Sequence, residues 1–275
     1  RQQNGDTMKI GIIGYGVVGK AVAYTLENNY ELIRYDKYVE LDSFDSLNDC
    51  SFVFVTVPTP FDCKKNIVDE SAIIESLDKL EKLDYKGCVI IKSTVPPGSS
   101  SSYSTKFNLS IAFNPEFLRE STSPNEDFRN QDTVVIGCDS LEMFGMIKKM
   151  YKSVLINNAK YYHTSIIEAE MIKCAQNTML ASRVAIANMI YDACMKNGID
   201  YETIRKIAFD RFDIIGPEMV LVPGPDGNRG FGGKCLPKDI RAFSTIHKSE
   251  LLENIIDYND SLRDDLKNFL DNYEK

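Results

Sequence analysis

Three glycines near the start of the chain constrain its fold more than any other feature. Gly14, Gly16 and Gly19 form a G-x-G-x-x-G pattern directly after the apolar run Lys9–Ile13 and before a segment with helical spacing. In such a turn the first glycine permits the bend, the second lets the backbone approach a pyrophosphate, and the third lets the helix pack closely on the strand. The pattern in this context predicts a dinucleotide-binding β-α-β unit.

An acidic residue follows at the distance that this unit requires. Asp36 ends a second expected strand, Leu32–Tyr35, about 20 residues after the glycines, where a carboxylate binds the ribose 2′-hydroxyl of a dinucleotide. The same carboxylate would repel a 2′-phosphate, so we expect NAD rather than NADP. The amide groups of Val17 and Val18, at the expected start of the helix, favour the pyrophosphate.

The next segments alternate between short strands and helices. Phe52–Val57 is apolar throughout, which is typical of a strand buried on both faces of a parallel sheet. Alternating strands and helices predict an α/β fold with a Rossmann-like, doubly wound parallel sheet. Further strands are expected at Val89–Ile91, Ile111–Phe113 and Val134–Ile136, and helices at Ser71–Leu83 and Leu141–Tyr151.

Helical spacing dominates after Thr164. Ile166–Met195 contains neither glycine nor proline and predicts one long helix, with shorter helices at Thr203–Phe209 and Leu251–Leu270. Val222–Lys238 is rich in glycine and proline and predicts a loop. We therefore expect a dinucleotide-binding domain at residues 8–164 and a helical central domain at residues 165–275. Residues 1–7 are polar, and we interpret them as a tag remnant before a native start at Met8.

Composition excludes several classes of function. The net charge of −8 argues against nucleic-acid binding, and no apolar run approaches the ~20 residues that cross a bilayer. Seven cysteines without a C-x-x-C pair favour a reducing, cytoplasmic setting over a disulfide framework. With His163 and His247 as the only histidines, and no cysteine cluster beside them, a metal site is not expected.

One cysteine has an environment suited to chemistry. Gly230–Asp239 reads GFGGKCLPKD, so Cys235 has small neighbours on one side and lies between Lys234 and Lys238. Nearby cations raise the fraction of the nucleophilic thiolate. Asp239, four residues later, could orient a water molecule or a base. The alternative is a structural cysteine, and we assign that role to the other six.

A second group shares one face of the long helix. Glu170, Lys173 and Asn177 are spaced by three and four residues. A lysine on so apolar a helix is costly to bury unless it has a partner or a function. The alternative interpretation is a Glu170–Lys173 surface pair, which is common and weak.

Polar residues also follow the expected strands. Glu116 and Glu120 come after one strand, at the carboxyl edge where α/β proteins bind ligands, although a solvated helix start is the alternative. Thr59 and Thr94 follow two other strands, next to Pro60 and Pro96. Ordinary turn chemistry would also explain these threonines.

Five segments in this order resemble the UDP-glucose/GDP-mannose dehydrogenase family. The resemblance covers about Met8 to Ile246, and a weaker sixth segment is EMIKCAQN at Glu170–Asn177. The five are IGIIGYGVVGKA at the N-terminus, VPTP at Val57–Pro60, KSTVPPGS at Lys92–Ser99, NPEFLRES at Asn114–Ser121 and GFGGKCLPKD at Gly230–Asp239.

The resemblance implies an NAD-dependent, metal-free oxidation of a nucleotide sugar at C6. The alcohol becomes an aldehyde, a cysteine traps it as a thiohemiacetal, a second oxidation gives a thioester, and water releases the acid. By resemblance Cys235 is the nucleophile, and Lys173 and Asn177 stabilise negative charge on oxygen. Thr94 and Asp239 would hold the water, and Glu116 and Glu120 would share base and positioning roles.

The resemblance also implies binding residues. Those expected to contact NAD are Gly14, Gly16, Val17, Val18, Asp36, Thr59, Pro60, Thr94, Glu120 and Lys238. Those expected to contact the nucleotide sugar, most closely UDP-glucose, are Glu116, Phe117, Leu118, Lys173, Asn177, Arg229, Phe231 and Gly232.

The chain departs from the family at its end. Family members continue into a second nucleotide-binding domain, whereas this sequence stops at Lys275, and the segment Val222–Arg229 is short. The long helix has apolar residues on more than one face, which predicts a homodimer.

Two other classes of protein remain open. A hydroxy-acid or 6-phosphogluconate-type dehydrogenase would share the glycine turn but needs no cysteine, so Cys235 argues against it. A non-catalytic NAD-binding module would not need the full set of catalytic residue types that this sequence retains.

Overall fold

The computed structural model describes residues 8–119, 122–155, 158–211, 220–246 and 248–263. The chain divides into two compact units. The first comprises Arg1–Thr59 and Asp69–Lys173, and the second comprises Pro60–Val68 and Cys174–Lys275.

A seven-stranded sheet forms the centre of the first unit, with strand order β2-β1-β3-β6-β7-β8-β9. The first five strands in this order are parallel to one another, which gives the Rossmann-like arrangement expected from the sequence. Strand β8 runs antiparallel to β7, and β9 is parallel to β8, so the last two strands are reversed. The bounds are β1 (Lys9–Ile13), β2 (Glu31–Tyr35), β3 (Phe52–Val55), β6 (Cys88–Ile91), β7 (Ser110–Phe113), β8 (Thr133–Gly137) and β9 (Lys160–Thr164).

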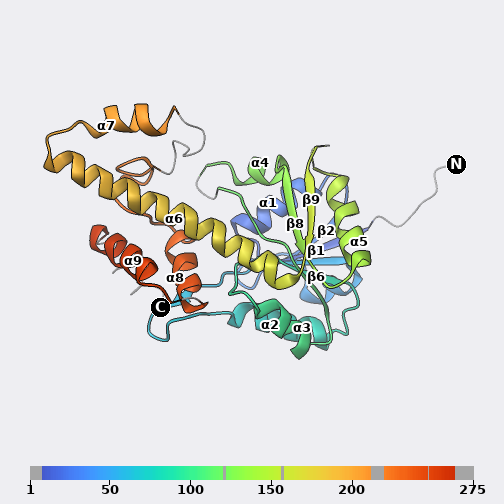
Figure 1. Cartoon of the computed structure of the whole chain (residues 1–275). Helices are drawn as coiled ribbons and strands as arrows, with labels where there is room; N and C mark the ends of the chain where they lie inside the picture. Colours follow the sequence, from blue (N-terminus) through green and yellow to red (C-terminus); the bar gives the residue numbers. More distant parts are fainter. Residues whose placement is uncertain (1–7, 120–121, 156–157, 212–219, 247, 264–275) are drawn as a thin grey trace. The chain divides into compact units, whose positions relative to one another are not determined.

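Helices cover both faces of this sheet (Figure 1). Along β3, Phe52 and Phe54 pack into one apolar cluster, whereas Val53 and Val55 pack into another, which confirms that this strand is buried on both sides. The first cluster includes side chains of α1 (Val17–Leu26), α4 (Pro124–Arg129) and α5 (Leu141–Lys152). The second includes side chains of the 3₁₀ helix η1 (Phe44–Asp49), α2 (Ser71–Lys82), α3 (Ser99–Lys106) and the first turn of α6 (Ile166–Lys196).

The second unit is mainly helical, as expected, and α6 continues into it from the first. Ala181 and Ala185 of α6 pack with Phe231, Ile240 and Leu252 in one apolar cluster. Its other elements are α7 (Tyr201–Ile204), the π turn η2 (Arg205–Phe209), α8 (Leu236–Ile246), α9 (Glu250–Leu262) and a hairpin of β4 (Phe61–Asp62) and β5 (Ile67–Val68). The helix expected at Leu251–Leu270 begins at Glu250 and ends at Leu262, because Arg263 has an extended backbone. The residues after Arg263 lie outside the described part of the chain.

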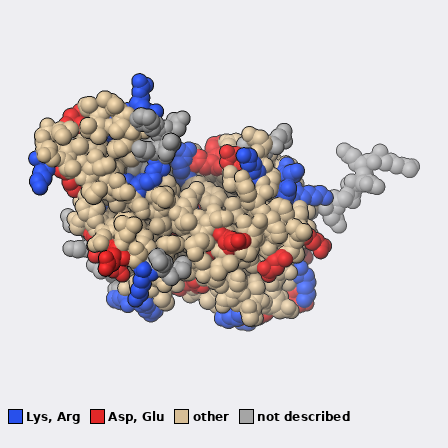
Figure 2. All heavy atoms as spheres, in the orientation of Figure 1, with Lys and Arg blue, Asp and Glu red and all other residues tan. Residues whose placement is uncertain are grey.

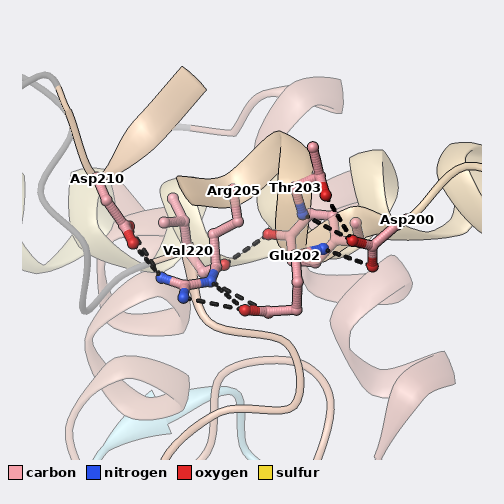
Figure 3. A network of polar contacts seen from close by, with 7 residues as sticks. Asp200, Glu202, Thr203, Arg205, Asp210 and Val220 are labelled. Carbon is pink, nitrogen blue, oxygen red and sulfur yellow. Dashed lines mark hydrogen bonds and ion pairs between the residues drawn. The ribbon is translucent and has the colours of Figure 1, made fainter. Parts of the chain in front are cut away.

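A polar network holds the turn at α7 (Figure 3). Asp200 accepts the N–H groups of Glu202 and Thr203, so it caps this short helix. Arg205 lies between Glu202 and Asp210 and donates to both carboxylates, at 3.0 and 2.7 Å. The helix expected at Thr203–Phe209 begins two residues earlier, and the π turn η2 replaces it from Arg205 onward.

Charges of both signs are interspersed over the face of the molecule drawn in Figure 2. In the part of the chain that the structure describes, no helix is both long and apolar enough to span a membrane. Within the same residues, no group of three or more histidine, cysteine or acidic side chains is arranged to hold a metal ion.

Candidate active site

The glycine turn has the geometry that a dinucleotide requires. Gly14 lies at the end of β1 with φ of +91°, a conformation that glycine adopts at little cost. A Cβ at Gly19 would overlap the carbonyl oxygen of Gly14, so a side chain there would push α1 away from β1. At Gly16, the N-cap of α1, a Cβ would meet no atom within 4 Å. The space beside Gly16 and the first-turn amides of Val17 and Val18 therefore suit a pyrophosphate.

Asp36 is fixed beside this turn. Its Oδ2 accepts the N–H of Tyr15 at 2.7 Å, and its Oδ1 accepts the N–H of Tyr38 at 2.8 Å. A carboxylate oxygen has two lone pairs, so each oxygen can still accept a ribose hydroxyl. The nearby cations are already engaged, Arg34 with Glu27 and Lys37 with Glu75.

The threonines after β3 and β6 lie together. The Oγ1 of Thr59, which is buried, donates a 2.7 Å hydrogen bond to the carbonyl oxygen of Thr94. Ser93 adds a second link between the same two segments, because its Oγ donates to the carbonyl oxygen of Val57 at 2.6 Å. Pro60 follows Thr59 in the chain and begins the segment that belongs to the second unit.

A buried lysine that the sequence analysis missed organises the segment after β7. The Nζ of Lys92 donates to Oδ1 of Asn114 at 2.8 Å and lies 4.9 Å from the centre of the Phe128 ring. It also lies 3.2 Å from Oε2 of Glu116, within ion-pair distance but outside hydrogen-bond geometry. Burial lowers the pKa of Lys92, and the Glu116 carboxylate opposes this. A lysine placed directly after a buried strand was the available signal.

Glu116 is held by the chain itself. Its Oε1 accepts the N–H groups of Phe117 and Leu118, both at 2.8 Å, and its other oxygen faces Lys92. This carboxylate is therefore buried and not part of a solvated helix start. Glu120 lies outside the described residues.

Two polar residues of α6 also lie in the first unit. The Nζ of Lys173 lies over the Phe117 ring, 5.6 Å from its centre, and the lysine is largely buried. Glu170 is fully buried and accepts the backbone N–H groups of Gly98 and Ser100. The surface pair between Glu170 and Lys173, offered as the alternative, is therefore wrong.

The second unit joins three of the expected catalytic residues. The Nδ2 of Asn177 donates to Oδ2 of the fully buried Asp239, and Oδ1 of Asp239 lies 3.3 Å from the Nζ of Lys238. The N–H of Asp239 in turn donates to the carbonyl oxygen of Cys235 at 2.8 Å. Residues 177 and 239, far apart in sequence, thus meet one helical turn from the exposed cysteine.

Cys235 directly precedes α8, which begins at Leu236. The loop expected to extend to Lys238 therefore ends three residues early, because Pro237 is compatible with the first turn of a helix. The N-terminal turn of a helix stabilises nearby negative charge, so this position favours a thiolate.

The glycines before the cysteine make room for the chain's own side chains. A Cβ at Gly230 would lie 2.6 Å from Oδ1 of Asn259, and one at Gly232 would overlap the Arg263 guanidinium. The buried Phe231 is paired through its backbone with Asn259. Arg229, expected to contact the substrate, donates to Asp192 at 2.5 Å.

Family models match both parts of the chain. Residues 26–155 match the NAD binding domain of the UDP-glucose/GDP-mannose dehydrogenase family, and residues 167–261 match the central domain of that family. The first match confirms NAD as the cofactor expected from the sequence.

Two curated relatives are named UDP-glucose 6-dehydrogenase. The protein of Rickettsia bellii is 36% identical over 219 residues, which cover 77% of this chain and 48% of that protein. The protein of Campylobacter jejuni is 28% identical and covers 92% of this chain and 72% of that protein. The chain spans about half the length of the Rickettsia relatives that it matches.

Solved structures share the fold. A UDP-glucose dehydrogenase from Pyrobaculum islandicum aligns with a TM-score of 0.81 at 21% identity, over 95% of this chain and 70% of that one. A 3-hydroxyisobutyrate dehydrogenase from Mycobacterium tuberculosis aligns with a TM-score of 0.69 at 12% identity, over 92% of both chains. At these identities the likeness concerns the fold alone. The two family matches carry the assignment: this chain belongs to the UDP-glucose/GDP-mannose dehydrogenase family.

Proposed function

We propose that this chain oxidises the C6 alcohol of a nucleotide sugar, with UDP-glucose as the favoured substrate. The product is the uronic acid, and the reaction passes through a covalent intermediate on Cys235. The observation that carries the proposal is the contact between Asn177 and Asp239, one helical turn from the exposed thiol. It joins two sequence motifs around a nucleophile, which a cofactor-binding module alone does not need.

The first half of the reaction forms the intermediate. The glycine turn and Asp36 would hold NAD, which would supply the hydride acceptor for each of the two oxidations at C6. The Cys235 thiolate attacks the C6 aldehyde, forming a carbon–sulfur bond while the carbonyl electron pair moves to oxygen. Lys173 and Asn177 stabilise that oxyanion, because fixed positive charge and N–H donors act strongly on charge that develops in a dry site.

The second half releases the acid. After the second oxidation, Cys235 carries a thioester. Thr94 and Asp239 hold the water that attacks it, one proton passes to a base, and the thiolate leaves. The contacts of Glu116 with two backbone amides and Lys92 favour a positioning role for this residue, which leaves Glu120 as the candidate base.

The NADH yield tests the reaction class. UDP-glucose, GDP-mannose and UDP-N-acetylmannosamine would be supplied in limiting amounts in parallel. Two NADH per sugar are expected for one substrate, because four electrons leave C6. One NADH per molecule of nucleotide sugar would instead indicate a two-electron dehydrogenase and would contradict the proposed reaction.

The chain is further proposed to act as a homodimer in a reducing compartment, the cytoplasm. All seven cysteines are free thiols. On the part of α6 within the helical unit, Met179, Ile186 and Met189 are exposed by 64%, 49% and 55% and recur at helical spacing. A second copy would cover this apolar stripe. Sedimentation at micromolar concentration tests this, and a monomer would contradict it.

A further inference from the structure

Glu170 is a buried carboxylate for which the proposed mechanism has no use. Its Oε2 accepts the N–H of Gly98 at 2.6 Å, and its Oε1 accepts the N–H of Ser100 at 2.8 Å. Gly98 is the N-cap of α3, and it has no side chain that could accept hydrogen bonds from the N–H groups of the first turn. A side chain from α6 therefore caps α3.

The capped turn is continuous with the segment that carries Thr94. Two prolines, Pro96 and Pro97, lie between Thr94 and Gly98, and proline fixes the backbone φ angle. Because this connection is stiff, the position of Gly98 constrains that of Thr94. On the other side of the contact, Lys173 lies one helical turn after Glu170 on α6.

We propose that Glu170 is a positioning residue that fixes the helical turn carrying Lys173 against the segment carrying Thr94. The inference rests on the proposed function, in which Lys173 acts on the oxyanion and Thr94 holds the attacking water. The oxyanion is bound to C6 and the water attacks C6, so the distance between Lys173 and Thr94 matters for the rate. A displacement of about 1 Å in such groups lowers the rate by up to about 100-fold.

The contact needs a carboxylate rather than an amide. Both carboxylate oxygens accept a hydrogen bond, whereas in glutamine one oxygen is replaced by an NH₂ group that cannot accept one. Glu170→Gln keeps the volume of the side chain, but its NH₂ group would face the backbone N–H of either Gly98 or Ser100, and two donors cannot form a hydrogen bond. The contact should therefore loosen without leaving a cavity.

A second anchor keeps α3 folded in such a variant. Glu70, just before α2, accepts hydrogen bonds from the hydroxyl groups of Ser99, at 2.8 Å, and of Tyr103. These two bonds do not involve α6. The loss of the Glu170 contact should thus shift α3 relative to α6 rather than unfold it.

The test compares Glu170→Gln with Glu168→Gln. Glu168 is exposed, lies two residues earlier on α6 and accepts bonds from Ser165, so it provides the same charge change on the same turn. We expect kcat of Glu170→Gln to fall about 10- to 100-fold, with KM and the NAD dissociation constant within about twofold of the wild type. Backbone amide exchange at Gly98 and Ser100 should become faster in Glu170→Gln alone.

A double mutant identifies the route of the effect. If Glu170 acts through Lys173, the change Glu170→Gln should have little further effect in a Lys173→Ala background. The inference would be overturned if Glu170→Gln lowered kcat in the Lys173→Ala background by the same factor as in the wild type. Equal kcat values for Glu170→Gln and Glu168→Gln would also overturn it. A lowered amount of NAD-binding protein that accounts for the lost activity would also overturn it, since the role would then be stability alone. No NADH from the wild-type chain would instead refute the proposed function.

Discussion

Adding a methyl group at Gly19 and adding one at Gly16 should damage the protein in different ways. In Gly19→Ala the new carbon would overlap the carbonyl oxygen of Gly14, a backbone atom that cannot rotate away. The helix α1 would have to move by about 1 Å, and overpacking of this kind costs about 1–3 kcal/mol. In a chain of this size, each kcal/mol lowers the melting temperature by about 2–4 °C.

The displaced helix should also bind NAD less well. The first-turn amides of α1 would no longer lie at the distance that the pyrophosphate requires, so we expect the NAD dissociation constant to rise at least about tenfold, or ~1.4 kcal/mol. Gly16→Ala provides the contrast. Its methyl group meets no atom within 4 Å, so the free energy of unfolding should change by less than about 1 kcal/mol.

The two variants would be compared by thermal unfolding without NAD and by calorimetric titration with NAD. Gly19→Ala should lose both stability and affinity. Gly16→Ala should lose affinity alone, because its methyl group occupies space beside the first turn of α1. An unchanged melting temperature for Gly19→Ala would refute the packing argument. Wild-type affinity in Gly16→Ala would show that the pyrophosphate lies elsewhere.

Four further predictions follow from the site. Cys235→Ser should abolish sustained NADH production, because serine is hard to deprotonate and an ester is a poor substitute for a thioester; turnover at the wild-type rate would exclude the covalent mechanism. Asp36→Ala should narrow the preference for NAD over NADP in titrations, and tighter NADP binding by the wild type would contradict the assignment. Lys92→Met should destabilise the protein by about 3–5 kcal/mol in urea unfolding, because it leaves a buried carboxylate without its cation, and adding Glu116→Gln should restore much of this loss. Burial raises the pKa of Glu170 above its ordinary 4.5, so the native state binds more protons than the unfolded state. The free energy of unfolding should therefore fall as pH rises from about 4.5 through the native pKa of Glu170. Unfolding measured over the same pH range in Glu170→Gln should lack this pH-dependent fall.

Two parts of the sheet were predictable from the sequence: the strand at Phe52 and the glycine turn after β1. The run at Phe52 is apolar on both faces because the strand lies between two apolar clusters, and the glycine turn needs local geometry alone. The reversal of β8 was not predictable from composition, since strand direction depends on the path of the connection. The hairpin between Phe61 and Val68 has strands of two residues, too short for any periodicity to appear.

Helix α3 shows where local propensity fails. Ser99–Lys106 contains six serines and threonines, which compete for backbone hydrogen bonds and disfavour a helix. Carboxylates from distant segments, Glu70 and Glu170, stabilise its first turn instead. Tertiary contacts between residues about 30 and 70 positions apart leave no mark in a local window.

The types of residue in the candidate site were predictable from the sequence, whereas the contacts between them were not. The pair of Asn177 and Asp239 could be suspected from family motifs, but its hydrogen bond depends on how α6 packs with α8. The space beside Gly230 and Gly232 is filled by Asn259 and Arg263, a pair of contacts that the sequence pattern does not indicate.

The cross-links at the carboxyl edge of the sheet have a common consequence for catalysis. The segments after β3 and β6 are joined by the hydrogen bond from Thr59 to Thr94, and those after β6 and β7 by Lys92 with Asn114. Glu170 then ties the same region to α6. Ordering a loop on binding costs free energy for each immobilised residue, and here the folding of the first unit has already met that cost. Fixed dipoles and charges that need no rearrangement stabilise a transition state most, so the strand-end groups should act without a conformational step of their own.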